Sequence, residues 1–195
     1  MFALMNLLQL AAIVVAGTMV GNELAVAVFF HPRISALDDA THVRAAQALA
    51  AALGRVMPFW YALTLVLSLA VALLAHPGGG LPRWLAIAAT GLFAAMIIYT
   101  VLLPVPINNQ VARWRPESLP ANWRELRRRW DRLHAFRVAV LLVALVLLVM
   151  SCLVSSAARP RAGDKFVVCS LVESASPRDL IGRPAVASSR AWSEP

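Results

Sequence analysis

Charged side chains are scarce in this sequence. They make up 14% of its 195 residues, whereas hydrophobic residues make up 60%, and the mean hydropathy is +0.70. Soluble domains carry about 25% charged residues. The composition therefore excludes an ordinary soluble domain and predicts a polytopic membrane protein.

Cysteine and the signatures of soluble enzymes are scarce or missing as well. The two cysteines, Cys152 and Cys169, do not define a disulfide framework. The sequence holds no G-x-G-x-x-G, G-x-x-x-x-G-K-[ST], G-x-S-x-G, H-E-x-x-H or C-x-x-C motif. It therefore lacks the usual signs of a nucleotide-binding enzyme, a serine hydrolase, a zinc peptidase or a dithiol oxidoreductase.

Long apolar runs are what the sequence has instead. About 20 apolar residues suffice for one bilayer crossing. Four segments reach that length, and we expect helices over residues 2–30, 41–76, 83–104 and 122–156. The predicted fold class is all-α: a four-transmembrane-helix up-down bundle over residues 1–156. A polar tail over residues 157–195, rich in Ser, Arg, Pro and Ala, is expected to be mostly disordered.

Proline marks the expected ends of these helices. His31-Pro32 should end the first helix, because the residue before proline is pushed out of the α conformation. The turn at residues 76–82 separates the second helix from the third, and Pro104 and Pro106 should stop the third. A loop over residues 107–121 then leads to the fourth helix.

The first apolar run could instead be a signal peptide, because Ala25-Val26-Ala27 resembles a cleavage site. No Lys or Arg precedes the run, however, and the run is too long for the hydrophobic part of a signal peptide. We therefore favour a retained helix.

The distribution of arginine predicts the orientation. Residues 31–55 and 105–137, which an up-down bundle places on one side, hold eleven Arg. The opposite side carries Arg83 and, after the last helix, Arg159, Arg161 and Lys165. The positive-inside rule then puts the Arg-rich loops in the cytoplasm and both termini outside, in what we expect to be a bacterial plasma membrane.

The same arginines suggest the partners. The formal net charge of +8 would suggest a nucleic-acid partner in a soluble protein. Here the basic residues flank membrane spans, so we predict membrane lipids and no nucleic acid. Arg127, Arg128 and Arg129 are expected to bind lipid phosphates. No oligomeric state is predicted.

A polar stripe enters the fourth helix. Trp123, Arg127, Trp130, His134 and Arg137 recur at intervals of three or four residues and so share one helical face. This face continues into an uncharged run. Because polar groups that face lipid are costly, the stripe must face protein or a water-filled cavity.

An up-down bundle gathers further polar residues at the end where the stripe lies. The sequence predicts a contact of Glu23 with Arg137 or with His134, since Glu23 is the best-placed acid. His76 lies at the opposite end and is predicted to be a solvated loop residue. The residues expected at the stripe's end are Glu23, His31, His42, Asn108, Asn109, Trp130, His134 and Arg137.

A metal site is one use of such a cluster. His31, His42 and His134 could ligate a metal ion, with Glu23 as the fourth ligand. Their spacing is not diagnostic, because the three histidines come from different segments. No cofactor is predicted, and a bound metal ion stays open. The plain alternative is structural: the Asn pair caps the third helix and His134 makes one hydrogen bond to a neighbouring helix.

Several elements together resemble a known family. The chain resembles the small four-helix membrane proteins of the DUF1772, or anthrone oxygenase-like, family over about residues 5–155. One departure is that the turn begins with Pro104 in place of Asn. The matching elements are Gly17, Gly21, His31-Pro32, Met57-Pro58, the Pro104-Val105-Pro106-Ile107-Asn108-Asn109 turn, Trp123, Leu126-Arg127, Arg129-Trp130, His134 and Arg137.

The resemblance implies a candidate activity. Some fungal members of the family are implicated in oxidising an anthrone to an anthraquinone. Carried over by position, Asn108, Asn109, Trp130, His134 and Arg137 are the candidates for a shared site. Glu23 joins them as a candidate catalytic residue, and Trp123 joins Trp130 as a candidate substrate-binding residue.

The implied chemistry needs a base and groups that stabilise an oxyanion. An anthrone ionises at a C–H next to its carbonyl, and the electron-rich anion can react with dioxygen. His134 is the predicted base, Arg137 and the two Asn amides hold the oxyanion, and Trp130 stacks on the flat apolar substrate. Replacing His134 by Ala is then expected to abolish activity without unfolding the protein.

A non-enzymatic membrane protein is the alternative. An accessory subunit, a small transporter or a lipid-binding protein would use the polar cluster as a helix-packing network. The two hypotheses differ in one structural feature. An enzyme should have a cavity beneath Asn108 and Asn109 into which His134 and Arg137 open, whereas a packing network would leave none.

Overall fold

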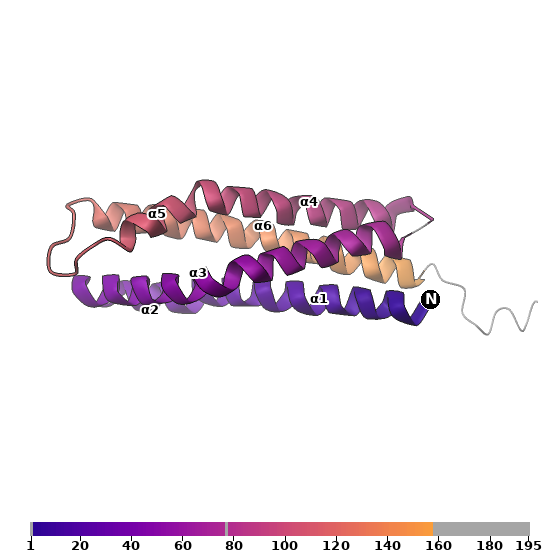
Figure 1. Ribbon diagram of the computed structural model, residues 1–195, viewed down its shortest axis with the longest axis horizontal. Coiled ribbons are helices and arrows are strands. Elements are labelled where there is room, and N and C mark those ends of the chain that lie inside the picture. The colour runs from indigo at the N-terminus through magenta and orange to yellow at the C-terminus, as the bar shows by residue number, and fades with distance from the viewer. Residues whose placement is uncertain (1, 77, 158–195) are drawn as a thin grey trace, which may run out of the picture. The chain divides into compact units, whose positions relative to one another are not determined.

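The computed structural model describes residues 2–76 and 78–157, and this part of the chain is all-helical (Figure 1). Four long helical segments, over residues 3–35, 39–75, 80–111 and 123–157, are apolar enough to cross a membrane. This confirms the predicted four-helix membrane fold and identifies an integral membrane protein. The expected disorder of residues 158–195 lies outside the described residues. The elements are α1 (Phe2–Ala25), the π-helical turn η1 (Val26–Phe30), α2 (His31–Ser35), α3 (Asp39–Ala70), the π-helical turn η2 (Val71–Ala75), α4 (Gly80–Leu102), α5 (Pro104–Val111) and α6 (Trp123–Ala157).

The sequence predicted that the first helix ends at His31-Pro32, and this prediction is wrong. It continues through η1 into α2 and ends at Ser35. Pro32 lies in the first turn of α2, where a missing N–H is tolerated. Local π-helical turns of this kind satisfy the backbone groups that a proline leaves free. His31 consequently begins a new α-helical segment and is buried.

The third helix also outlasts its expected end. α4 stops at Leu102, but α5 begins two residues later with Pro104. Pro104 and Pro106 both lie in the first turn of α5, whose N–H groups need no intrahelical acceptor. Asn108 and Asn109 therefore lie in a helix, and the turn predicted for them is wrong.

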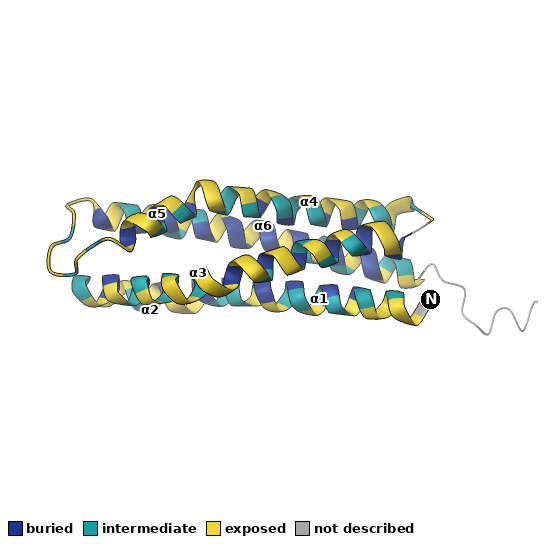
Figure 2. Cartoon of the chain, viewed as in Figure 1, coloured by how far each residue is buried: buried dark blue, intermediate teal, exposed yellow. Residues whose placement is uncertain are grey.

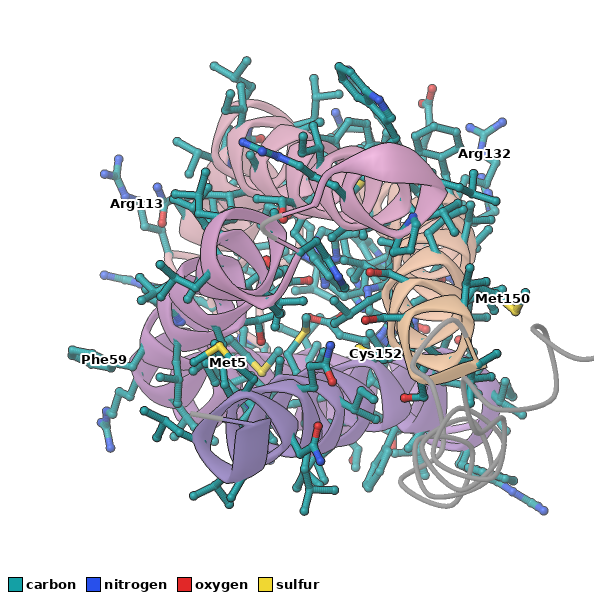
Figure 3. All side chains as sticks on the ribbon, turned by 90° about the vertical axis from the view of Figure 1, so that its right-hand side faces the viewer. Met5, Phe59, Arg113, Arg132, Met150 and Cys152 are labelled. Carbon is teal, nitrogen blue, oxygen red and sulfur yellow. The ribbon has the colours of Figure 1, made fainter. Side chains whose placement is uncertain are left out.

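Small side chains fill the centre of the bundle. Ala16, Ala86 and Ala144 are fully buried and allow the helices to approach closely. Phe93 and Leu141 are fully buried in the same cluster. Other large apolar side chains lie outside: Phe59 and Met150 point away from the bundle, whereas Cys152 points into it (Figure 3). Exposed positions accordingly run along the outer side of every long helix (Figure 2). This distribution is the one expected of a bundle surrounded by lipid.

Each long helix carries a stretch of 20 uncharged residues: 3–22, 56–75, 84–103 and 138–157. A helix of that length spans about 30 Å, the thickness of the hydrocarbon layer. Glu23, Arg55 and Arg137 border three of these stretches, and the contact of Glu23 with Arg137 places both residues at the same end of the bundle. The spans are 33, 37, 32 and 35 residues long, so at this end all four helices extend beyond the apolar layer.

Side-chain contacts close this extended end. Asp38 caps α3 by accepting a hydrogen bond from the Thr41 N–H at 3.1 Å. Hydrogen bonding with the Thr41 side chain, and then with this N–H, lowers the pKa of the Asp38 carboxyl. On α3, Gln47 donates to the backbone carbonyls of Val111 and Trp114 at 2.9 and 3.0 Å. These bonds fasten the segment between α5 and α6 to α3.

Candidate functional site

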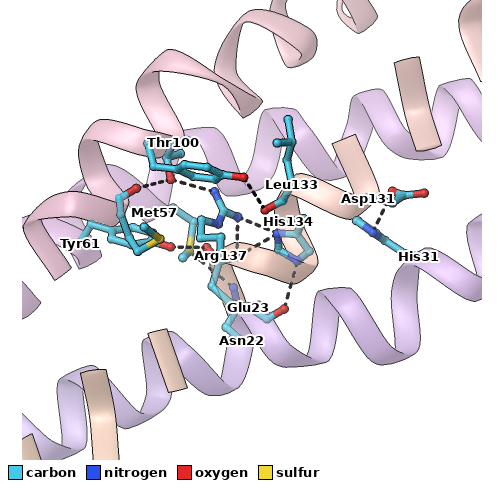
Figure 4. Close-up of polar contacts among 12 residues, drawn as sticks. Asn22, Glu23, His31, Met57, Tyr61, Thr100, Asp131, Leu133, His134 and Arg137 are labelled. Carbon is cyan, nitrogen blue, oxygen red and sulfur yellow. Dashed lines mark hydrogen bonds and ion pairs between the residues drawn. The ribbon is translucent and has the colours of Figure 1, made fainter. Parts of the chain in front are cut away.

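A buried carboxylate joins three helices. Glu23 on α1 is 3% exposed. Its Oε1 accepts a hydrogen bond from the Tyr61 hydroxyl of α3 at 3.0 Å, and its Oε2 accepts one from Arg137 Nη2 of α6 at 2.5 Å (Figure 4). The predicted contact of Glu23 with Arg137 is confirmed, and both carboxylate oxygens have partners.

His134 is bonded at both ring nitrogens. Its Nε2 lies 3.2 Å from the backbone carbonyl of Glu23, and its Nδ1 lies 2.8 Å from Arg137 Nη2. A carbonyl only accepts and a guanidinium only donates, so Nε2 carries the proton and Nδ1 accepts. The ring is 1% exposed. Since its lone pair is directed at Arg137, the geometry argues against His134 as the base.

A second polar group lies on the other side of His134. His31 Nδ1 is 3.1 Å from Asp131 Oδ1 (Figure 4), and Arg127 Nη2 is 3.6 Å from the same oxygen. Arg127 is 7% exposed and its guanidinium lies over the Trp130 ring at 5.0 Å. The sequence suggested that Arg127 binds lipid phosphates at the surface. The structure instead places Arg127 on the buried face of α6.

Three rings connect the two polar groups. Trp130 stacks on His134 with ring centroids 4.8 Å apart and planes 16° apart. His31 lies 4.7 Å from the Trp130 ring and 5.1 Å from the His134 ring. The aromatic cluster holds His31 in place and leaves its Nε2 without a hydrogen bond to any described residue.

Except for Asp131, these groups line one cavity of about 370 Å³. Ligand sites are typically about 300–1,000 Å³. Leu53, Met57, Leu65 and Ile97 of α3 and α4 form much of its apolar wall. Its polar side is formed by His31, Asn108, Arg127, Trp130, His134 and Arg137. The sequence analysis expected a cavity beneath the Asn pair into which His134 and Arg137 open, and the lining of this cavity includes Asn108, His134 and Arg137.

A family model described as anthrone oxygenase matches residues 46–147, just over half of the chain. The chain belongs to the anthrone oxygenase family. No curated protein and no solved structure matches it. In this family member the matched segment contains Asn108, Arg127, Trp130, His134 and Arg137, whereas Glu23 and His31 precede it.

Some residues predicted for the site lie away from the cavity. Asn109 is exposed on α5, because it follows Asn108 around the helix. His42 and Trp123 are buried against each other, with ring centroids 5.2 Å apart, and neither lines the cavity. Two turns of helix separate Trp123 from Trp130, which places it beyond the cavity.

The metal site proposed from the sequence is not assembled. Among the described residues, no three His, Cys, Asp or Glu side chains are grouped as metal ligands. Glu23 is occupied by Arg137 and Tyr61, and His42 lies apart. His76 lies at the opposite end of the bundle, as expected, but its predicted solvation is wrong: it is 4% exposed, and its Nε2 lies 2.8 Å from Ser151 Oγ.

Sequence reasoning missed three residues of the site. Asp131 contacts His31, Tyr61 bonds Glu23, and Thr100 Oγ1 accepts from Arg137 Nη1 at 3.3 Å. A signal existed for Tyr61, since Tyr61, Thr64 and Ser68 recur at helical spacing and form a weakly polar buried stripe. Asp131 lies outside the polar stripe of α6, so no pattern in the sequence pointed to it. Only the packing of α2, which carries His31, shows that Asp131 belongs to the site.

Proposed function

We propose that the protein uses dioxygen to oxidise a flat, apolar substrate of the anthrone type in this cavity. The observation that carries the proposal is the cavity itself, apolar over most of its wall and lined at one end by His31 and Trp130. Family membership supports the same reaction. The cavity begins where the uncharged stretches end, so a lipid-soluble substrate could reach it from the bilayer.

His31 is the better base in this arrangement. Asp131 beside Nδ1 favours the tautomer with a proton on Nδ1, which leaves the lone pair on Nε2. Nε2 belongs to a ring that lines the cavity and has no hydrogen bond to a described residue. An imidazole held by a carboxylate on one side and free on the other is suited to take a proton.

The reaction balances with dioxygen as the only co-reactant. His31 Nε2 removes one proton from the carbon opposite the anthrone carbonyl, which leaves a delocalised anion. The anion adds dioxygen at that carbon, and protonation gives a hydroperoxide. Loss of the second hydrogen from the same carbon, with cleavage of the O–O bond, forms the new carbonyl and releases water. One anthrone and one dioxygen thus give one anthraquinone and one water.

The test uses purified full-length protein in lipid nanodiscs with anthrone. Dioxygen uptake and anthraquinone absorbance are followed together, with and without a chelator, and the rate in empty nanodiscs is subtracted because anthrones oxidise spontaneously. We expect equal amounts of dioxygen consumed and quinone formed. His31→Gln should lower the rate by at least about 100-fold, the usual contribution of a general base, whereas His76→Gln, at the other end of the bundle, should not. A rate equal to that of empty nanodiscs would reject the proposed function.

A further inference from the structure

Two buried arginines on one face of α6 differ in how they are neutralised. Arg127 and Arg137 are each 7% exposed. Arg137 donates to Glu23 and Thr100 and lies 2.8 Å from His134 Nδ1. Arg127 makes no hydrogen bond with a described residue, and its nearest carboxylate oxygen is 3.6 Å away. The Arg127 guanidinium is therefore an incompletely paired cation that lines a cavity.

The two carboxylates near the cavity balance the two guanidiniums while the histidines are neutral, so one proton on His31 leaves these groups one negative charge short. α1 contributes Glu23, α2 His31, α3 His42 and Tyr61, and α6 Arg127, Asp131, His134 and Arg137. Glu23 neutralises Arg137. Asp131 is shared between His31 and Arg127 and lies nearer to His31. Once His31 holds a proton, Asp131 pairs with it, and Arg127 has no anion of its own. A buried cation without a partner is unfavourable, so an anion from outside is favoured.

We propose that Arg127, whose guanidinium lies over the Trp130 ring, forms an oxyanion subsite that binds the ligand as a phenolate or enolate anion. This subsite rests on the proposed function, which supplies the flat ring system of the ligand. It adds that the ligand binds with its oxygen ionised. The guanidinium supplies several N–H donors to one oxygen. The apolar wall of the cavity, which includes Leu53, Met57 and Ile97, holds the attached rings. A lipid phosphate offers similar anionic oxygens, but Arg127 faces the cavity, and lipid composition distinguishes the two sources.

The experiment follows the ionisation of a bound ligand that cannot be oxidised further in this reaction. 2-Hydroxyanthraquinone is titrated by absorbance in nanodiscs of zwitterionic lipid, with and without the full-length protein. We expect its phenol to ionise at least about one pH unit lower when bound, which is a tenfold change in the ionisation constant. Arg127→Gln should abolish the shift and Arg127→Lys should keep part of it. The matched control, Arg128→Gln, should keep the full shift because Arg128 is the exposed neighbour.

Three results would overturn the subsite. These are an unshifted ionisation in the wild-type protein, an equal loss in the Arg128 variant, and a shift that disappears when anionic lipid is added. If Arg127→Gln does not fold, the wild type alone decides. Its affinity for 2-hydroxyanthraquinone above the phenol pKa must exceed its affinity for anthraquinone by at least about tenfold, one unit of ionisation. A shift without any oxidase activity would reject the proposed function and keep the subsite, whereas oxidation without a shift would reject only the subsite.

Discussion

At the scale of single residues, the proposed function moves the role of base from His134, the sequence prediction, to His31. His134 bonds at both nitrogens and is almost fully buried, so it holds Arg137 and α1 in place. His31 has one nitrogen near Asp131 and the other free of described partners. The sequence could not separate them, because both are histidines at the polar end of the bundle.

This reassignment predicts that His134→Ala mainly destabilises the protein. It removes the donor to the Glu23 carbonyl and the acceptor of an Arg137 N–H. A buried polar group left without a partner costs about 1–3 kcal/mol. Thermal unfolding in detergent should therefore show a clearly lower melting temperature, while the remaining folded protein keeps measurable oxidation. A variant with wild-type stability and no activity would restore His134 as the base.

The pair of Glu23 and Arg137 should be strongly coupled. Arg137→Met alone strands a buried carboxylate and Glu23→Gln alone strands a guanidinium, each at a cost of about 3–5 kcal/mol. The double variant removes both charges and should lose less stability than the sum of the single variants. The free energy of unfolding of the wild type, the two single variants and the double variant is measured in a series of mixed detergents. Additive losses would show that the contact contributes little.

At the scale of elements, small residues on α3 create the cavity. Gly54, Pro58 and Ala62 recur every four residues, are exposed and line the cavity. Val101 of α4 also lines it, although it is 58% exposed. The cavity thus reaches the outer surface between α3 and α4. With larger side chains at these positions, α3 would close it.

A large side chain in the opening between α3 and α4 should prevent the ligand from binding in the cavity. A Cβ atom added at Gly54 meets no atom within 4 Å, and the same is true at Gly91, which is exposed on α4 but does not line the cavity. Gly54→Leu should therefore weaken binding of anthracene, measured by fluorescence, at least about tenfold (~1.4 kcal/mol, less than the full burial of a large apolar side chain). Gly91→Leu, the matched control, should bind normally. Equal binding by the two variants would mean that the ligand lies elsewhere.

At the scale of the whole molecule, the uncharged stretches fix the depth of the site relative to the membrane. The arginines predict the side of the membrane on which it lies. The polar end of the bundle should face the cytoplasm. In intact cells, a membrane-impermeant maleimide should not label Ser118→Cys, made in a Cys169→Ser background, until the membrane is opened. Cys169 should label from outside without that step. The opposite pattern would reverse the orientation.

The sequence alone determined the membrane fold, because long apolar runs have few alternatives to spanning helices. It also limited the expected partners of Glu23 to Arg137 or His134, since an acid bordering the apolar layer must pair with a polar group at the same depth or leave the layer. Tertiary structure decided the rest. The π-helical turn before His31 adds a residue to the turn, which rotates the downstream residues by about 100° and takes His31 off the face that an α-helix predicts. Which polar atoms are paired and which stay free then depends on ångström-scale distances between four helices. Periodicity along one helix carries no information about those distances.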